Sequence, residues 1–180
     1  MAKSIGKKKV RTAVFISGRG SNLKNLIKFS KTKKSPIEIN LVISDKEAAG
    51  LKYALHNKIK KKIIYFKNKK DAENKILDKL KKENIEFICL AGFLKILSKA
   101  FIKNFKKKII NIHPSYLPKY KGLNTSLRVI ENKERFTGCT VHYVNSKLDS
   151  GKIILQKKVR INKNETEKSL DKKIIQQEHK

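Results

Sequence analysis

Apolar and polar residues follow two different periods along the chain, and the two periods alternate. Nearly continuous apolar runs such as Ile85 to Ala91 predict buried strands, whereas apolar side chains at helical spacing, such as Ile76, Leu77 and Leu80, predict helices. The predicted strands are 9–17, 37–44, 62–66, 85–91, 108–111, 137–144 and 152–160. The predicted helices are 22–31, 47–56, 69–83, 98–105, 123–132 and 165–180.

This alternation predicts an α/β fold of the Rossmann-like kind, a mainly parallel sheet with helices on both faces. Residues 145–151 separate the last two strands and are too few for a helical crossover, so one late strand is expected to run antiparallel. The chain contains no internal repeat and no linker. We therefore expect a single domain over 1–180, with a frayed basic segment at 1–9.

Length and composition narrow the class of protein. A chain of 180 residues can bury a core without disulfides or metal. Its apolar runs are much shorter than the roughly 20 residues of a transmembrane helix, and its start does not read as a secretory signal. Cys89 and Cys139 lie in strand-like contexts, and no Cys and His residues have zinc-finger spacing. These features predict a cytoplasmic protein with reduced thiols, without a membrane partner and without a metal.

The net charge of +30 makes a basic nucleic-acid-binding module an alternative of a different class. The basic residues are 40 Lys and only 5 Arg, and the lysines occur in nearly every segment. Recognition of bases and phosphates favours the planar Arg fork, and Lys shares A/T-rich codons with the abundant Ile and Asn. We interpret most of the charge as a compositional bias of the surface, expect no specific nucleic acid partner, and keep a polyanion site as the alternative.

A glycine-containing loop, Ser17 to Leu23, follows the first predicted strand. Glycines let the backbone approach a ligand and amides at a helix N-terminus favour anions, which makes Gly20, Ser21 and Asn22 candidates for phosphate binding. The loop lacks the Gly-Lys-Ser/Thr ending of nucleoside-triphosphate loops and the third glycine of dinucleotide-binding proteins. The alternative is an ordinary turn with Ser21 or Asn22 as the helix N-cap.

Two further polar segments contain candidates for acid–base chemistry. Asn111 and His113 lie at the carboxyl end of a predicted strand, and strand alternation points both to the same side. A histidine can carry a proton near neutral pH, and a carboxamide can donate a hydrogen bond to an oxyanion. Asp149, in a predicted turn, could orient His113 and raise its pKa. The alternatives are a polar strand end and an ordinary turn, and we interpret His142 as a packed core histidine.

In this order, these segments resemble the phosphoribosylglycinamide formyltransferases, which are folate-dependent enzymes of purine biosynthesis. The matching segments are 16–23, 90–97, 111–122, 138–144 and 148–151. Asn-x-His-Pro-Ser-x-Leu-Pro with a later Leu-Asp-x-Gly is typical of folate formyl-transferring enzymes, and the Gly-x-Gly-Ser-Asn-Leu loop is typical of this family. The resemblance implies the formyltransferase fold and transfer of a formyl group from the co-substrate 10-formyltetrahydrofolate to the amine of 5-phosphoribosylglycinamide.

The resemblance also implies a catalytic trio of Asn111, His113 and Asp149. Asn111 would stabilise the oxyanion, His113 would pass a proton to the departing folate nitrogen, and Asp149 would keep His113 charged. The implied contacts to the ribonucleotide are Gly20, Ser21 and Asn22 for the phosphate and Glu178 for the ribose. The implied folate contacts are Lys69, Leu94, Lys95, Ile96, Leu97 and Asn111.

The chain departs from the family pattern at two places. Ser126 stands where many members have a histidine, and few residues follow Glu178, so we expect the last helix to be poorly anchored. Formyltetrahydrofolate deformylase and methionyl-tRNA formyltransferase are the nearest alternatives, although each usually carries an extra domain for which this length leaves no room. A dinucleotide-dependent oxidoreductase is a further alternative. The expected partners are the two small molecules, with the chain acting as a monomer or homodimer.

Overall fold

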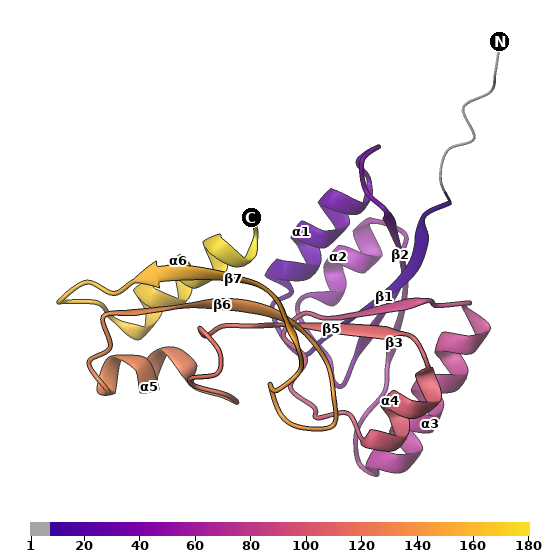
Figure 1. Ribbon diagram of the computed structural model, residues 1–180. Helices are drawn as coiled ribbons and strands as arrows, with labels where there is room; N and C mark the ends of the chain where they lie inside the picture. The colour runs from indigo at the N-terminus through magenta and orange to yellow at the C-terminus, as the bar shows by residue number, and fades with distance from the viewer. Residues whose placement is uncertain (1–7) are drawn as a thin grey trace.

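The computed structural model describes residues 8–180 and contains a single mixed sheet flanked by helices (Figure 1). The strands are β1 (Val10–Ile16), β2 (Ile37–Ser44), β3 (Lys60–Ile63), β4 (Phe87–Leu90), β5 (Lys108–His113), β6 (Phe136–Tyr143) and β7 (Ile153–Arg160). The helices are α1 (Ser21–Ser30), α2 (Leu51–His56), α3 (Lys69–Lys82), α4 (Lys99–Phe105), α5 (Thr125–Glu131) and α6 (Glu167–Glu178).

The seven strands lie in the order β3-β2-β1-β4-β5-β6-β7. The first five strands of this order pair in parallel, whereas β6 runs antiparallel to both β5 and β7. The Rossmann-like, mainly parallel sheet with one late antiparallel strand is therefore confirmed.

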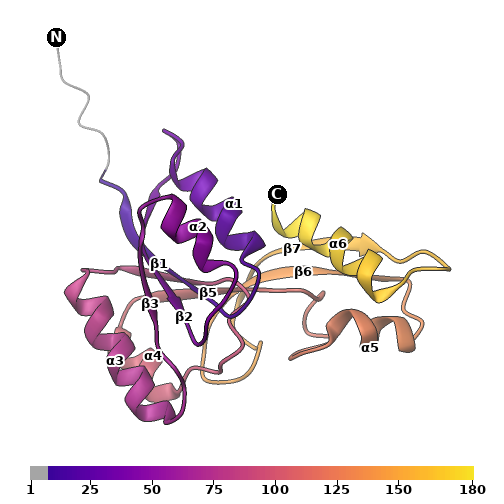
Figure 2. The same ribbon diagram turned by 180° about the vertical axis from the view of Figure 1, so that it is seen from behind.

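Side chains of β1 alternate between two apolar layers, as a strand covered on both faces requires. Phe15 packs with Ile76 of α3 and Phe101 of α4, whereas Val14 packs with Leu23 of α1. Figures 1 and 2 show α1 and α2 on one face of the parallel strands and α3 and α4 on the other. The helices thus bury both faces of the sheet and leave the carboxyl ends of its strands to neighbouring loops.

β6 and β7 extend away from the parallel strands (Figure 1). α6 packs on both of these strands, and α5 packs against α6. Leu170 and Ile174 of α6 are fully buried against Val129 of α5 and Cys139 of β6. The last helix is therefore firmly anchored, and the expectation of a poorly anchored end was wrong. The burial of Leu170 and Ile174, one helical turn apart, is enough to fix α6 on the sheet. Burial also raises the pKa of the Cys139 thiol to about 11, so this cysteine stays protonated.

Most predicted elements differ from the structure by a residue or two at their ends, and two differ more clearly. The helix predicted at 47–56 begins only at Leu51, and its N-cap, Gly50, donates its backbone N–H outside the helix, to the Gly18 carbonyl at 3.0 Å. The strand predicted at 62–66 is β3, Lys60–Ile63. This strand lies at the sheet edge, where exposed lysines are tolerated, so its position has no apolar signal.

The expected frayed segment, 1–9, lies mostly outside the described residues. Its last residue, Lys9, is described, and its ammonium donates to the Ser30 and Thr32 carbonyls at 2.7 and 3.0 Å. Within residues 8–180, no helix is long and apolar enough to cross a lipid bilayer.

Candidate active site

A cavity of about 330 Å³ lies at the carboxyl ends of β4 and β5. One side is formed by the 92–97 loop after β4, and the other contains Asn111, His113 and Asp149. Ligands of open α/β sheets bind outside the carboxyl ends of the strands, and polar groups converging in a mostly apolar pocket are typical of an active site. We therefore regard this cavity as the candidate active site.

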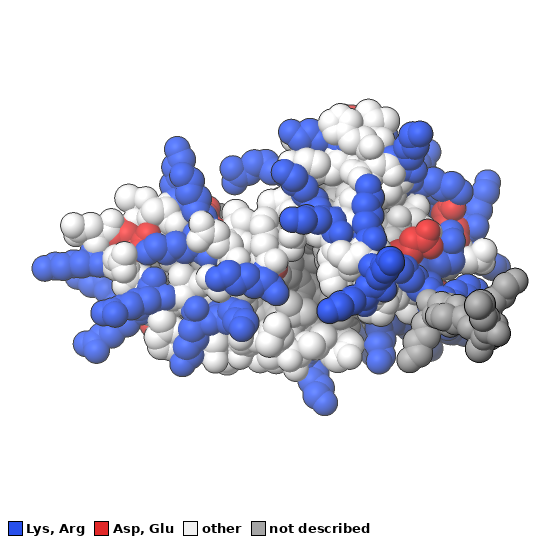
Figure 3. Space-filling model, turned by 90° about the horizontal axis from the view of Figure 1, so that it is seen from above, with Lys and Arg blue, Asp and Glu red and all other residues white. Residues whose placement is uncertain are grey.

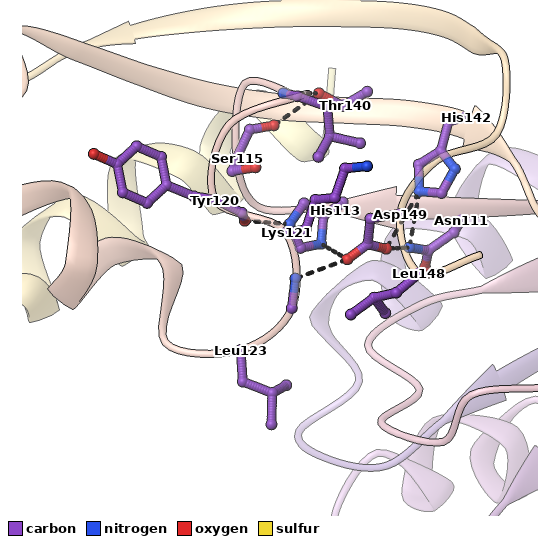
Figure 4. A network of polar contacts seen from close by, with 12 residues as sticks. Asn111, His113, Ser115, Tyr120, Lys121, Leu123, Thr140, His142, Leu148 and Asp149 are labelled. Atoms are coloured by element: carbon purple, nitrogen blue, oxygen red, sulfur yellow. Dashed lines mark hydrogen bonds and ion pairs between the residues drawn. The ribbon is translucent and has the colours of Figure 1, made fainter.

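His113, the last residue of β5, is held at both ring nitrogens (Figure 4). Its Nε2 lies 2.9 Å from the Tyr120 carbonyl oxygen and its Nδ1 lies 3.4 Å from Oδ2 of Asp149. The side chains of His113 and Asp149 are each more than nine-tenths buried. Two acceptor oxygens from different loops thus flank the ring: a neutral ring can donate to only one of them, and a protonated ring to both.

Asn111 lies two residues before His113, so strand alternation places its carboxamide beside the same carboxylate. Its Nδ2 donates to Oδ1 of Asp149 at 3.4 Å and lies 3.2 Å from Nε2 of His142. The structure therefore brings Asn111, His113 and Asp149 together, although Asp149 is far from the other two in sequence.

The pKa of His113 is lowered, because burial disfavours the charged ring and outweighs the other influences. The Tyr120 carbonyl and the Asp149 carboxylate act in the opposite direction, while the charges of His142 and Arg128 add to the lowering. The expectation that Asp149 leaves His113 with a raised pKa was therefore wrong in net direction. The carboxylate does raise the pKa, but burial of the ring could not be foreseen from sequence.

Burial alone would raise the pKa of Asp149, yet the net direction is down. The His142 ring, the Gly122 amide and the charge of His113 favour the ionised carboxylate. Gly122 donates its N–H to Oδ2 at 2.9 Å, and Nε2 of His142 lies 3.6 Å from Oδ1. Asp149 therefore remains a carboxylate near neutral pH.

His142 is buried, as expected for a core histidine, but it also belongs to this polar cluster. β6 pairs with β5 so that His142 stands directly opposite Asn111, and its Nδ1 lies 2.9 Å from the Tyr143 carbonyl. Sequence reasoning missed this role because it depends on the register of an antiparallel pair. The alternation of Thr140 and His142 on a strand is the only sequence signal that could have indicated it.

The glycine-containing loop lies at the start of α1, where Gly20 has a left-handed φ of 73° and is itself the N-cap. No side chain caps the helix, so the alternative in which Ser21 or Asn22 is the cap was wrong. The side chain of Asn22 instead donates to Oε2 of Glu178 in α6 at 2.9 Å. The structure thus brings Asn22 and Glu178 together and leaves the first amides of α1 without a side-chain acceptor.

Leu94, Lys95, Ile96 and Leu97 all line the cavity. Leu94 and Ile96 are about half exposed, whereas Leu97 is buried. The Lys95 ammonium lies 3.8 Å from Oδ2 of the buried Asp45. Lys69, the first residue of α3, is exposed and is not among the residues that line this cavity.

The other two residues singled out from the family pattern both involve α6. Ser126 donates its hydroxyl to Oδ1 of Asp171 at 2.6 Å and so joins α5 to α6. Glu178 has a raised pKa, because burial and the charge of Asp171 outweigh the hydrogen bond from Asn22. Both residues thus help to hold α6 in place.

Lysine and arginine side chains are scattered over both halves of the face seen in Figure 3, on either side of a largely uncharged centre, and do not gather in a single stripe. On this face, the distribution is the one expected of a compositional bias of the surface. Among residues 8–180, no three His, Cys, Asp or Glu side chains are grouped so that they could hold a metal ion.

Residues 10–180 match the Formyl transferase family, and the chain belongs to that family. A relative named phosphoribosylglycinamide formyltransferase, from Haemophilus influenzae, is 39% identical over 94% of this chain and 82% of its own length. The crystal structure of phosphoribosylglycinamide formyltransferase from Anaplasma phagocytophilum has a TM-score of 0.89 and 40% identity, covering 96% of this chain and 82% of that chain.

A third relative is the human trifunctional purine biosynthetic protein adenosine-3, which is 41% identical over 98% of this chain. The present chain spans only 18% of that protein's length. The similarity therefore concerns one segment of the human protein.

Proposed function

We propose that this protein transfers the formyl group of 10-formyltetrahydrofolate to the amine of 5-phosphoribosylglycinamide, giving N-formylglycinamide ribonucleotide and tetrahydrofolate. The observation that carries the proposal is the cluster of Asn111, His113 and Asp149 beside an apolar cavity in a formyl transferase fold. The Haemophilus and Anaplasma relatives, which the chain matches over most of their length, carry the name of this activity.

In the proposed reaction the substrate amine attacks the formyl carbon, and a C–N bond forms as the carbonyl oxygen becomes an oxyanion. The carboxamide N–H of Asn111 donates a hydrogen bond to this oxyanion, a contribution worth about 3 kcal/mol in comparable sites. The bond from the formyl carbon to N10 of the folate then breaks. The amine loses one proton and N10 gains one, so the reaction is balanced.

The proposed role of His113 is to carry that proton. Its pKa is lowered by burial, so a proton that it holds is readily given up. Asp149 remains ionised, favours the protonated ring and fixes its orientation. Leu94 and Ile96, half exposed at the cavity, would contact the folate, while the Gly20–Asn22 loop and Glu178 would hold the ribonucleotide.

The experiment that tests this proposal mixes the protein with both substrates and follows tetrahydrofolate by absorbance and the formylated ribonucleotide by mass spectrometry. We expect both products in equal amounts, and no tetrahydrofolate when the ribonucleotide is omitted. Release of formate and tetrahydrofolate without the ribonucleotide would instead assign hydrolysis, the deformylase reaction. Absence of turnover with both substrates present would refute the proposal.

A further inference from the structure

The two loops that hold His113 each place a residue in the left-handed backbone region, which residues other than glycine rarely adopt. Tyr120 has φ 56° and turns its carbonyl to Nε2 of His113, while Asp149 has φ 42° and turns its carboxylate to Nδ1. Figure 4 shows Tyr120 and Asp149 on opposite sides of the ring. Strained backbone of this kind persists only where surrounding contacts hold it.

The residues that follow these two strained positions bond to each other across the loops. Lys121 donates from its ammonium to the hydroxyl of Ser150 at 2.6 Å. The same hydroxyl donates its only proton to the Leu148 carbonyl at 2.7 Å, so its donor and acceptor roles are consistent. Lys121 is partly buried and forms no ion pair with any described carboxylate.

Neighbouring contacts keep the Lys121 side of this bond in place. Gly122 donates its N–H to Asp149, and Arg128 of α5 donates to the Lys121 carbonyl at 2.7 Å. The Arg128 guanidinium also lies over the Tyr120 ring at 5.4 Å. Three successive residues, Tyr120 to Gly122, therefore each contact a different part of the site.

We propose that Lys121 and Ser150 form a loop clasp that positions the Tyr120 carbonyl and the Asp149 carboxylate against the two nitrogens of His113. Neither residue touches a nitrogen of His113, so both are positioning residues. When the clasp is broken, the Gly122 N–H still bonds to Asp149, but the loop that carries Asp149 is held less firmly against the loop that carries Tyr120. The Asp149 carboxylate then lies less closely against the His113 ring and favours its protonation less, while burial and the charges of His142 and Arg128 continue to oppose protonation.

Lys121→Met and Ser150→Ala break the clasp from its two sides, and the His113 ring is titrated by NMR in each variant. We expect the pKa of His113 to fall by about half a unit in Ser150→Ala and by less in Lys121→Met, where the lost positive charge acts in the opposite direction. The double variant should show no further fall, because both changes remove the same bond. This titration needs no substrate, so its result stands apart from the proposed formyl transfer.

The direction of the shift separates positioning from a simple effect of charge. Loss of the Lys121 charge alone would raise the pKa of His113 in Lys121→Met and leave Ser150→Ala unchanged. Lys119→Met is the matched control, because Lys119 lies in the same loop but bonds to Glu134 at 2.8 Å. Ser150→Thr, which keeps a hydroxyl, should restore the wild-type titration.

The kinetic half of the test rests on the proposed function. We expect kcat to fall about tenfold in Lys121→Met and Ser150→Ala, with both KM values within twofold of wild type. Thermal unfolding identifies variants that do not fold, and Ser150→Ala, the smaller change, then decides alone. A folded Ser150→Ala with an unchanged His113 titration would overturn the clasp.

Discussion

The glycine-containing loop at β1 and the histidine cluster at β5 both lie at carboxyl ends of strands, but they are built in different ways. Gly20 is held by backbone contact: a Cβ added there would lie 2.7 Å from Cα of Gly50. His113 is held by side chains and carbonyls from segments distant in sequence. The first region thus depends on the absence of side chains, and the second on the presence of particular ones.

This difference determines what each region can tolerate. A substitution in the loop acts through space and backbone conformation, so it should disturb binding of the ribonucleotide and also stability. A substitution in the cluster removes a proton carrier or a charge, so it should disturb the chemical step and leave binding in place. The following variants test this separation.

The largest expected effect is that of His113→Ala. We expect kcat to fall about 1,000-fold, the scale of a lost acid–base group, with substrate affinities measured by calorimetry changed less than threefold. His56→Ala is the matched control, because His56 is exposed on α2. If His113→Ala lost affinity rather than rate, the cluster would be a binding region and the comparison with the loop would fail.

The loop and the cluster also differ in how far the sequence predicts them. The Gly-x-Gly-Ser-Asn-Leu loop is a continuous signal after an apolar strand, so its position was predictable from local pattern. The strand alternation that aligns Asn111 with His113 was equally local. The contribution of His142 was not, because it requires the register Asn111↔His142 between β5 and β6. The lowered pKa of His113 was missed because burial is a property of the whole fold.

Asp149→Asn should lower kcat about 100-fold and change its dependence on pH. Activity that needs protonated His113 falls as pH rises through the pKa of His113, which burial already lowers. Removing the carboxylate lowers that pKa further, so the alkaline decline moves to lower pH. The fold should survive, because Asn tolerates the left-handed φ of 42° at this position.

Profiles of kcat against pH for wild type and Asp149→Asn check this expectation. The matched control is Asp78→Asn on α3, which should leave the profile unchanged. Superimposable profiles for wild type and Asp149→Asn would return Asp149 to the role of an ordinary turn residue.

Gly20→Ala should raise the KM for the ribonucleotide about tenfold and leave the KM for the folate unchanged. The added Cβ meets Gly50 backbone and the φ of 73° is unfavourable for alanine, so the melting temperature should fall as well. Gly18→Ala is the matched control, because a Cβ at Gly18 has no atom within 4 Å. Equal effects of the two substitutions on KM would show that the close approach to Gly50 is irrelevant to binding.

The smallest expected effect concerns Glu178, which connects α6 to the loop through Asn22. Its pKa is raised by burial, so the folded state prefers the protonated carboxyl. The stability that protonation provides is present below the ordinary pKa of 4.5 and is lost as pH rises through the raised value.

Glu178→Gln is neutral at every pH and can still accept from Asn22, so it avoids this loss. We expect its melting temperature to exceed that of wild type by about 2 °C at pH 8 and to match it at pH 4. The KM for the ribonucleotide should rise in the same variant if Glu178 makes the proposed ribose contact. Glu167→Gln, on an exposed position of the same helix, serves as the control and should show no gain at pH 8. A pH-independent difference for Glu178→Gln would show that burial does not raise the pKa of Glu178.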